Sequence, residues 1–284
     1  KVLDIGGIDY TRDNIAHGQL ANDISRIMVG QPIGIGYGYV ADGNYQLDEF
    51  WAVDRNGRQF SAETIVTEGN YDNYKYELKD GVTRINSVTV QPGDRKYRDL
   101  DGDNEITVAD KTVISDSNPD FTMGLGNTFN IFGVELSFFF EGVFGRDIMN
   151  EFKLRSESGQ SGGTQFNNLT KDAWHGRWTT DNPSNTYSRL LNQTNTWVSS
   201  YYVEDGSFVR LKNLSLGYTF DNPRLRKAKI SGIKLSFNAD NLFVLTKYSG
   251  MDPDVSSSNP LFTGFDRLSY PKARTFTFGI GMTF

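Results

Sequence analysis

Five long segments of this chain alternate between apolar and small polar residues. Their ranges are 121–131, 134–145, 207–220, 232–245 and 274–284. Because successive side chains of a β-strand point to opposite faces, a period of two predicts strands. An earlier strand is expected at 33–41, and short helices only at 168–174 and 109–113. The sequence therefore predicts an all-β architecture of about six strands, most of roughly 10–14 residues.

The residues opposite the apolar ones decide which class of β protein is expected. They are mostly Thr, Ser, Asn and Gly, whereas the outer face of a soluble sandwich usually carries Lys, Glu and Arg. A wide membrane barrel turns apolar side chains to lipid and small polar ones to a wet lumen. Aromatic residues suited to interfacial girdles stand at strand ends: Phe121, Tyr218, Phe220 and Phe284. The pattern favours an antiparallel transmembrane β-barrel, with a secreted β-sandwich as the alternative.

The lengths of the connections sharpen this prediction, because long and short ones alternate. The short connections are 132–133 and 221–231, and the long ones are 42–120, 146–206 and 246–273. Outer-membrane barrels have short periplasmic turns and long extracellular loops. We therefore expect a periplasmic C-terminus and extracellular long loops. About six strands cannot close a wide barrel, so residues 1–284 are expected to be the C-terminal part of a larger barrel.

Composition excludes several other classes. The 284 residues include no cysteine, which excludes a disulfide scaffold, a thiolate zinc site and a cysteine nucleophile. A formal net charge of −6 argues against a nucleic-acid partner. The mean hydropathy is −0.48. With no apolar run of about 20 residues, transmembrane helices are not expected, but barrel strands escape this test.

An acidic segment from Asp99 to Asp110 gives the sharpest local signal. Its carboxylates at loop positions 1, 3, 5 and 12 match a calcium loop of the EF-hand type, and they are Asp99, Asp101, Asp103 and Asp110. Glu105 would offer its backbone carbonyl, and Ile106 would anchor the loop inward. Asn104 stands where glycine is usual, and asparagine tolerates the left-handed conformation needed there. We expect a structural Ca²⁺ site, with a solvated acidic turn as the alternative.

The last eight residues form a second candidate signal. Thr277, Gly279, Met282 and Phe284 fit a polar–glycine–apolar–aromatic pattern at the end of the chain. This pattern resembles the assembly signal that the outer-membrane insertion machinery reads by pairing with the last strand. An ordinary edge strand is the alternative. The chain opens at Lys1 without a Met and stops on an aromatic residue of this strand.

Other candidates are weak, and none predicts an enzyme. His17 and His175 lie far apart without a nucleophile motif beside them. Three tryptophans and an arginine in a long loop suit either sugar stacking or a small core of that loop, and they are Trp174, Arg177, Trp178 and Trp197. The basic run 224–229 is interpreted as a solvated periplasmic turn rather than a phosphate-binding patch.

Several phrases, in order along nearly the whole chain, resemble SusC/RagA-type TonB-dependent transporters of Bacteroidetes outer membranes. They are Val29-Gly-Gln-Pro-Ile-Gly34, Gln91-Pro-Gly-Asp94 with the acidic loop, Tyr202 to Tyr218, Asn241-Leu-Phe243, Lys247-Tyr-Ser-Gly250 and Arg274 to Gly279. Asn104 is a departure, since the family usually has glycine there.

The resemblance implies a barrel of about 22 strands, preceded by a plug and a TonB box that this chain lacks. It implies a SusD-like lipoprotein lid on the outer loops, oligosaccharide or peptide substrates, and energy delivered by TonB. A dimer of transporter–lid pairs is compatible with it. The leading hypothesis is therefore a nutrient importer. The alternatives are a secreted β-sandwich glycan-binding module with a calcium-stapled loop and an extracellular glycan hydrolase, which no motif supports.

Overall fold

The computed structural model describes residues 27–158, 168–190, 197–227, 229–255 and 263–284. The chain folds into two compact units. The first comprises the described parts of 1–117, 149–203 and 257–267, and the second those of 118–148, 204–256 and 268–284. No described helix is both long and apolar enough to cross a membrane.

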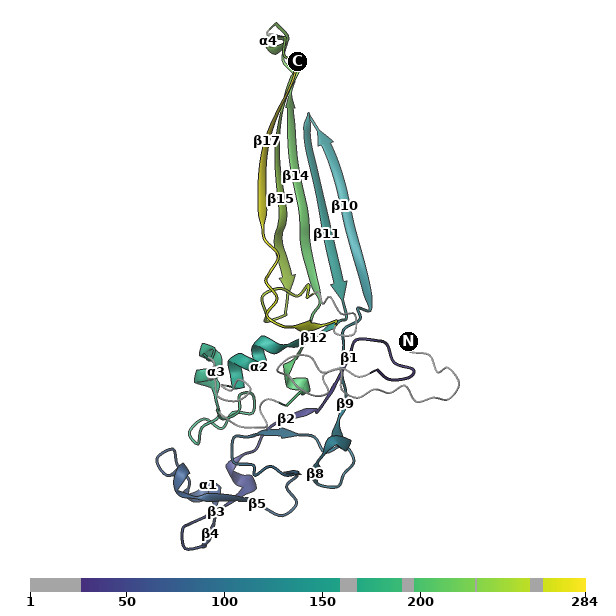
Figure 1. Cartoon of the computed structure of the whole chain (residues 1–284). Coiled ribbons are helices and arrows are strands. Elements are labelled where there is room, and N and C mark those ends of the chain that lie inside the picture. The colour runs from purple at the N-terminus through teal and green to yellow at the C-terminus, as the bar shows by residue number, and fades with distance from the viewer. Residues whose placement is uncertain (1–26, 159–167, 191–196, 228, 256–262) are drawn as a thin grey trace. The chain divides into compact units, whose positions relative to one another are not determined.

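The second unit is one antiparallel sheet of five long strands (Figure 1). The strands are β10 (Phe121–Ile131), β11 (Val134–Phe144), β14 (Phe208–Phe220), β15 (Gly232–Thr246) and β17 (Thr275–Thr283). They pair in that order, each with the next of the five long strands along the chain. All five alternating segments are therefore strands, with bounds within two residues of those expected from sequence.

The turn between β10 and β11 is as short as expected. Phe132 and Gly133 have φ angles of 51° and 82°. Two consecutive positive φ angles are typical of the type I′ turn, whose twist matches that of the flanking strands. The connection between β14 and β15 is also short and contains α4 (Pro223–Lys227), a helix that sequence analysis missed.

A β-bulge interrupts the register in the middle of the sheet. Asn213 pairs with Phe139, but Leu211 pairs with Phe140, so Lys212 is an extra residue on β14. On β15 the shift falls at Asn241, whose φ is 52°. Asparagine adopts this left-handed conformation more readily than most residues. The bulge keeps the apolar residues of each strand on one face while adding twist.

The first unit is built from short elements and has its own apolar cores. Its strands are β1 (Ile35–Gly38), β2 (Ala41–Asn44), β3 (Phe50–Val53), β4 (Gln59–Ser61), β5 (Lys75–Leu78), β6 (Arg84–Ile85), β7 (Arg95–Tyr97), β8 (Glu105–Ile106), β9 (Thr112–Asp116) and β16 (Phe265–Asp266). Its helices are η1 (Leu47–Glu49), α1 (Ala62–Ile65), η2 (Tyr71–Asn73), η3 (Val108–Asp110), α2 (Glu151–Ser158), α3 (Lys171–Gly176) and η5 (Ser200–Tyr202). Strands β12 (Asp147–Asn150) and β13 (Val203–Asp205) lie where the chain passes between the units.

Two sequence-based expectations need correction here. The strand expected at 33–41 is only four residues long and pairs with β9 in a two-stranded sheet, not with the long strands. The described residues therefore contain five long strands, not six. The helix expected at 109–113 is a short 3₁₀ turn followed directly by strand β9. The helix expected at 168–174 is confirmed as α3, shifted by about a turn.

The Gln91–Asp94 motif is a tight turn that fastens the first unit. The N–H of Asp94 donates to the Gln91 carbonyl at 3.0 Å, and Gly93 has a φ of 88°. This is the geometry of a type II turn with proline at its second position. Asp94 is fully buried, pairs with Arg189 and accepts the N–H of Gln91 at 2.8 Å.

A buried ion pair anchors the connection after β15 to the sheet of the second unit. Arg210 on β14 is 3% exposed and donates to Asp252, which is 8% exposed. Asp252 also accepts the N–H groups of Asp254 at 2.9 Å and Lys272 at 3.1 Å. One carboxylate thus joins a strand to both ends of a long connection.

We predict that Gly93→Ala destabilises the first unit by about 1–3 kcal/mol, because of backbone strain and crowding. A Cβ there would lie 2.4 Å from Cε3 of Trp178. Gly57→Ala is the matched control, since Gly57 has a φ of 78° but no atom within 4 Å of its Cβ position. Thermal unfolding of the purified protein, followed by tryptophan fluorescence, measures both variants. Equal losses would show that the Trp178 contact contributes nothing.

Asp252→Ala should release the connection after β15, since it leaves the buried Arg210 without a counter-charge at a cost of about 3–5 kcal/mol. Asp254→Ala, which removes only a partly exposed pair with Lys272, should cost no more than about 1 kcal/mol. Protease cleavage within 247–274 and the midpoint of thermal unfolding report both changes. Similar effects of the two variants would contradict an anchoring role for Asp252.

The same anchor makes a pH prediction. Burial alone would raise the pKa of Asp252. The N–H groups of Asp254 and Lys272, with the Arg210 guanidinium, outweigh burial and hold that pKa below its usual value. A carboxyl group with a lowered folded-state pKa stabilises the fold above its unfolded pKa of about 3.9. Protease protection should therefore hold from neutral pH to about pH 4 and fall as the pH drops further.

Candidate functional site

The apolar face of the five-stranded sheet is exposed to its surroundings. On the last strand Phe278 is 79% exposed and Ile280 is 73% exposed, and on β10 every residue is exposed. Cross-strand partners continue these apolar rows, as where Leu235 pairs with both Tyr218 and Ile280. A continuous exposed apolar face that extends over five strands marks a surface that meets protein or membrane rather than water. A sandwich would instead cover it with a second sheet.

The opposite face of the sheet is mostly polar and carries ion pairs between strands. Glu135 on β11 contacts Lys234 on β15 at 3.3 Å, across Gly217 on β14. Glu141 contacts Lys212 at 3.0 Å. These exposed pairs are hydrated and contribute little stability. This face is therefore suited to contact with water.

The acidic loop brings three of its expected ligands together. One carboxylate oxygen from each of Asp99, Asp101 and Asp103 lies within 4.8 Å of the other two. Oxygens that bind one Ca²⁺ at about 2.4 Å lie at most about 4.8 Å apart, so the three fit a single ion. Each carboxylate also accepts a backbone N–H from further along the loop, such as that of Asn104 to Asp99 at 2.7 Å.

Asn104 and Ile106 take the conformations expected from sequence. Asn104 has a φ of 63°, which is the left-handed conformation. Ile106 is 1% exposed and pairs with Ile85 in the parallel β6–β8 pair, so it anchors the loop in the first unit's core.

Asp110 and Glu105 do not join the carboxylate cluster. The two oxygens of Asp110 accept the N–H groups of Leu100 and Thr107, both at 2.7 Å. Asp110 is fully buried and closes the loop by joining its first and last turns. The carboxylate of Glu105 instead contacts Arg84 at 3.0 Å, which leaves only its backbone carbonyl for the expected role.

Repulsion from neighbouring carboxylates helps to raise the pKa of Asp101, whereas the pKa of Asp99 is lowered. At Asp99 the backbone N–H of Gly102, with others, lowers the pKa. At Asp101 the N–H of Asp103 also lowers it, but desolvation and the neighbouring carboxylates prevail and the pKa is raised. A bound cation would relieve this repulsion.

The tryptophans of the long loops divide between core and surface. Trp178 is 4% exposed, and Trp197 stacks on Tyr97 and Tyr39 in the first unit's core. Trp174 on α3 is 48% exposed, with the Arg177 guanidinium 3.9 Å from the centre of its ring. The loops thus have a small core of their own, and Trp174 lies on the surface of its unit. His17 lies outside the described residues, and His175 lies at the end of α3.

The last strand presents the residues of the expected assembly signal on two faces. Met282 and Phe284 belong to the exposed apolar face, whereas Thr277 and Gly279 pair with Asn238 and Ser236 of the polar face. A Cβ at Gly279 would lie 2.5 Å from Oγ of Ser236, which would have to rotate to make room for it. Among the described strands, β17 has a neighbour on one side only.

Comparisons with known proteins fit these observations. The chain is 33% identical over 90% of its length to TonB-dependent receptor P3 of Formosa agariphila, and 24% identical over 78% of its length to TonB-dependent receptor SusC of Bacteroides thetaiotaomicron. It covers only 22% and 23% of those proteins, so it spans about a quarter of their length. No family model matches the chain.

Solved structures show the same fold. The RagAB peptide importer in its open-open state superimposes on 100% of the chain with a TM-score of 0.60 and 20% identity. A structure of the RagAB peptide transporter covers 92% of the chain with a TM-score of 0.61 and 20% identity. The match covers 25% and 24% of those chains. The chain is therefore homologous, over most of its length, to SusC/RagA-type TonB-dependent receptors and has the all-β fold of their barrels.

Proposed function

We propose that this chain forms part of the barrel wall and outer loops of an outer-membrane importer for oligosaccharides or peptides. The observation that carries the proposal is a sheet with an exposed apolar face, a polar face that carries ion pairs, and connections that alternate between short and long. Such a sheet suits lipid on one side and a wet lumen on the other.

The long connections would lie outside the cell, and the C-terminus in the periplasm. The described parts of 27–117 and 149–203 fold with 263–267 into a unit with its own cores. A SusD-like lipoprotein lid would bind this outer unit, and Trp174 with Arg177 has the chemistry of a protein contact. TonB would act through the plug region and supply the energy, so that the chain itself catalyses no reaction.

Uptake by cells tests the proposal. Deleting the parent gene should abolish energy-dependent uptake of one substrate class, either labelled oligosaccharides or labelled peptides, and complementation should restore it. Collapse of the proton gradient should stop uptake in the complemented cells. Uptake that persists after deletion would refute the importer. Recovery of the intact parent protein in the soluble fraction without detergent would favour the secreted sandwich instead.

The acidic loop would hold a structural Ca²⁺ ion. Asp99, Asp101 and Asp103 would supply carboxylate oxygens, and Glu105 its backbone carbonyl, while Asp110 closes the loop. A Ca²⁺ ion takes 6–8 oxygen ligands, so water would complete the shell. The ion would tie down an outer loop and take no part in transport chemistry.

We predict that Asp101→Ala combined with Asp103→Ala abolishes Ca²⁺ binding at residues 99–110, because it removes two of three converging carboxylates. Metal density in the structure of the intact protein and calorimetric titration with Ca²⁺ measure the effect. Glu63→Ala combined with Asp72→Ala removes the same charge from exposed positions of the same unit and should change nothing. Density that persists near 99–110 in the first variant would refute the site.

The final strand would act as the assembly signal of the barrel. Its one unpaired edge among the described strands offers the backbone N–H and C=O groups that edge pairing needs. Thr277, Gly279, Met282 and Phe284 would be the residues recognised.

A further inference from the structure

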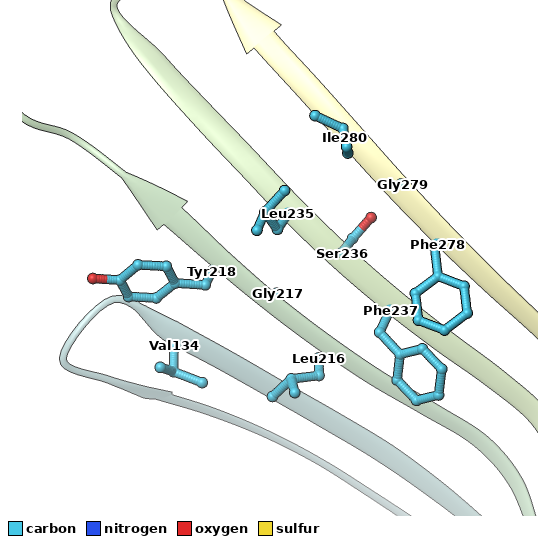
Figure 2. Close-up of a pocket in the computed structure, with 10 residues that line it drawn as sticks. All are labelled: Val134, Leu216, Gly217, Tyr218, Leu235, Ser236, Phe237, Phe278, Gly279 and Ile280. Atoms are coloured by element: carbon cyan, nitrogen blue, oxygen red, sulfur yellow. The ribbon is translucent and has the colours of Figure 1, made fainter. Parts of the chain in front are cut away.

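A shallow apolar groove of about 400 Å³ crosses the apolar face of the sheet (Figure 2). Two cross-strand rows of side chains form its walls. One row is Tyr218, Leu235 and Ile280, and the other is Leu216, Phe237 and Phe278. The volume is within the range of pockets that bind small molecules, roughly 300–1,000 Å³.

The space between the rows is lined by small residues. Gly217, Ser236 and Gly279 stand at the intervening positions of three neighbouring strands. In a strand, intervening residues direct their side chains to the opposite face, and two of these three have none. The floor of the groove is therefore mostly backbone whose hydrogen bonds are already made within the sheet, and it suits an apolar guest.

A cluster of cations lies in the turn just beyond the groove. The connection 221–231 has four exposed cationic side chains, which are Arg224, Arg226, Lys227 and Lys229. Its one carboxylate, Asp221, contacts Arg226 at 2.6 Å. The turn is therefore locally positive, whereas the whole chain carries a formal net charge of −6.

The groove and the cations are close along the strands. Tyr218 is two residues from the end of β14, and Leu235 is three residues from the start of β15. At about 3.3 Å per residue, the groove begins roughly 7–10 Å from the turn. Figure 1 shows α4 and the C-terminus at the same end of the sheet. An amphipathic molecule with one anionic end can therefore reach both features.

We propose that this face binds one anionic glycerophospholipid of the periplasmic leaflet, with an acyl chain in the groove. Its phosphate would lie at the turn 224–229, which the sequence alone predicts to be merely solvated. The charge of the turn and the apolar lining of the groove together select this occupant. Clusters of Lys and Arg beside a membrane-spanning element attract anionic lipid headgroups. The leaflet rests on the orientation proposed above, in which short turns face the periplasm.

The charge of the turn is tested on the intact parent transporter purified in detergent. Native mass spectrometry would count bound phosphatidylglycerol during a titration, with phosphatidylcholine of the same acyl chains as the neutral reference. Removing three cations in Arg224→Gln/Lys227→Gln/Lys229→Gln leaves the Arg226–Asp221 pair and should weaken binding by roughly tenfold or more. The matched control is Arg55→Gln/Lys75→Gln/Lys171→Gln, which removes the same charge from exposed positions of the first unit.

The groove is tested by filling it. Leu216 lines the groove and is 42% exposed, whereas Leu125 on β10 is 52% exposed on the same face and does not line it. Leu216→Trp should therefore reduce phosphatidylglycerol binding several-fold, and Leu125→Trp should leave it unchanged.

Three results would overturn the proposal: equal affinity for both lipids, equal losses in the two charge variants, or undiminished binding in Leu216→Trp. The orientation is checked separately. The chain has no cysteine of its own, so Asn222→Cys gives one new thiol in the turn. It should react with an impermeant maleimide only after the outer membrane is opened. Labelling in intact cells would show that the turn is extracellular. It would contradict the assignment of the lipid to the periplasmic leaflet, whatever the lipid affinity. None of these measurements depends on import, so a failure of the proposed transport would be recognised independently.

Discussion

The exposed apolar face of the five-stranded sheet constrains the rest of the structure. The backbone N–H and C=O groups of its paired strands bond to one another, so the inner strands can lie in hydrocarbon without unsatisfied polar groups. If this face were exposed to water, the sheet would lose the stabilisation of about 25 cal/mol per Å² that burial of apolar surface provides. The face therefore favours an apolar environment, and in the proposed importer lipid would provide it. Connections between the strands must then lie at the two ends, where water begins.

The opposite, polar face of the sheet is under a weaker constraint, and it carries mostly small residues and exposed ion pairs. Small residues such as Gly124 and Gly126 lie beneath the ring of Phe139, whose atoms come within 3.1 Å and 3.3 Å of their Cβ positions. Cross-strand ion pairs such as Glu135 with Lys234 are hydrated there and tolerate change. In the proposed importer this face would need no catalytic group, and substrate selection would depend on residues in the loops and elsewhere in the barrel. The chain's relatives are receptors and transporters.

The long strands could be predicted from sequence because a period of two is a local property. Segments such as 121–131 carry that period throughout except at Asn127, and the register then follows from the two-residue turn at 132–133. The strand expected at 33–41 is shorter than expected and lies outside the long sheet. Its partner, β9, is more than 70 residues away, so only tertiary contacts define its length. In the acidic loop, alternate spacing predicted that three carboxylates would converge. It could not reveal that Asp110 would be used by the N–H groups of Leu100 and Thr107.

A chain without cysteine must hold its long connections by other means. A connection of some 60 residues, such as 146–206, loses much conformational entropy when it orders, and secreted proteins often offset this with disulfides. Here buried ion pairs do so: Asp94 with Arg189 in the first unit, and Arg210 with Asp252 in the second. Each pair also binds backbone N–H groups, which satisfies the remaining oxygens of its carboxylate. A Ca²⁺ ion in the acidic loop would stabilise a long connection in a similar way. It would neutralise carboxylates that repel one another and so hold the backbone of the loop in one conformation.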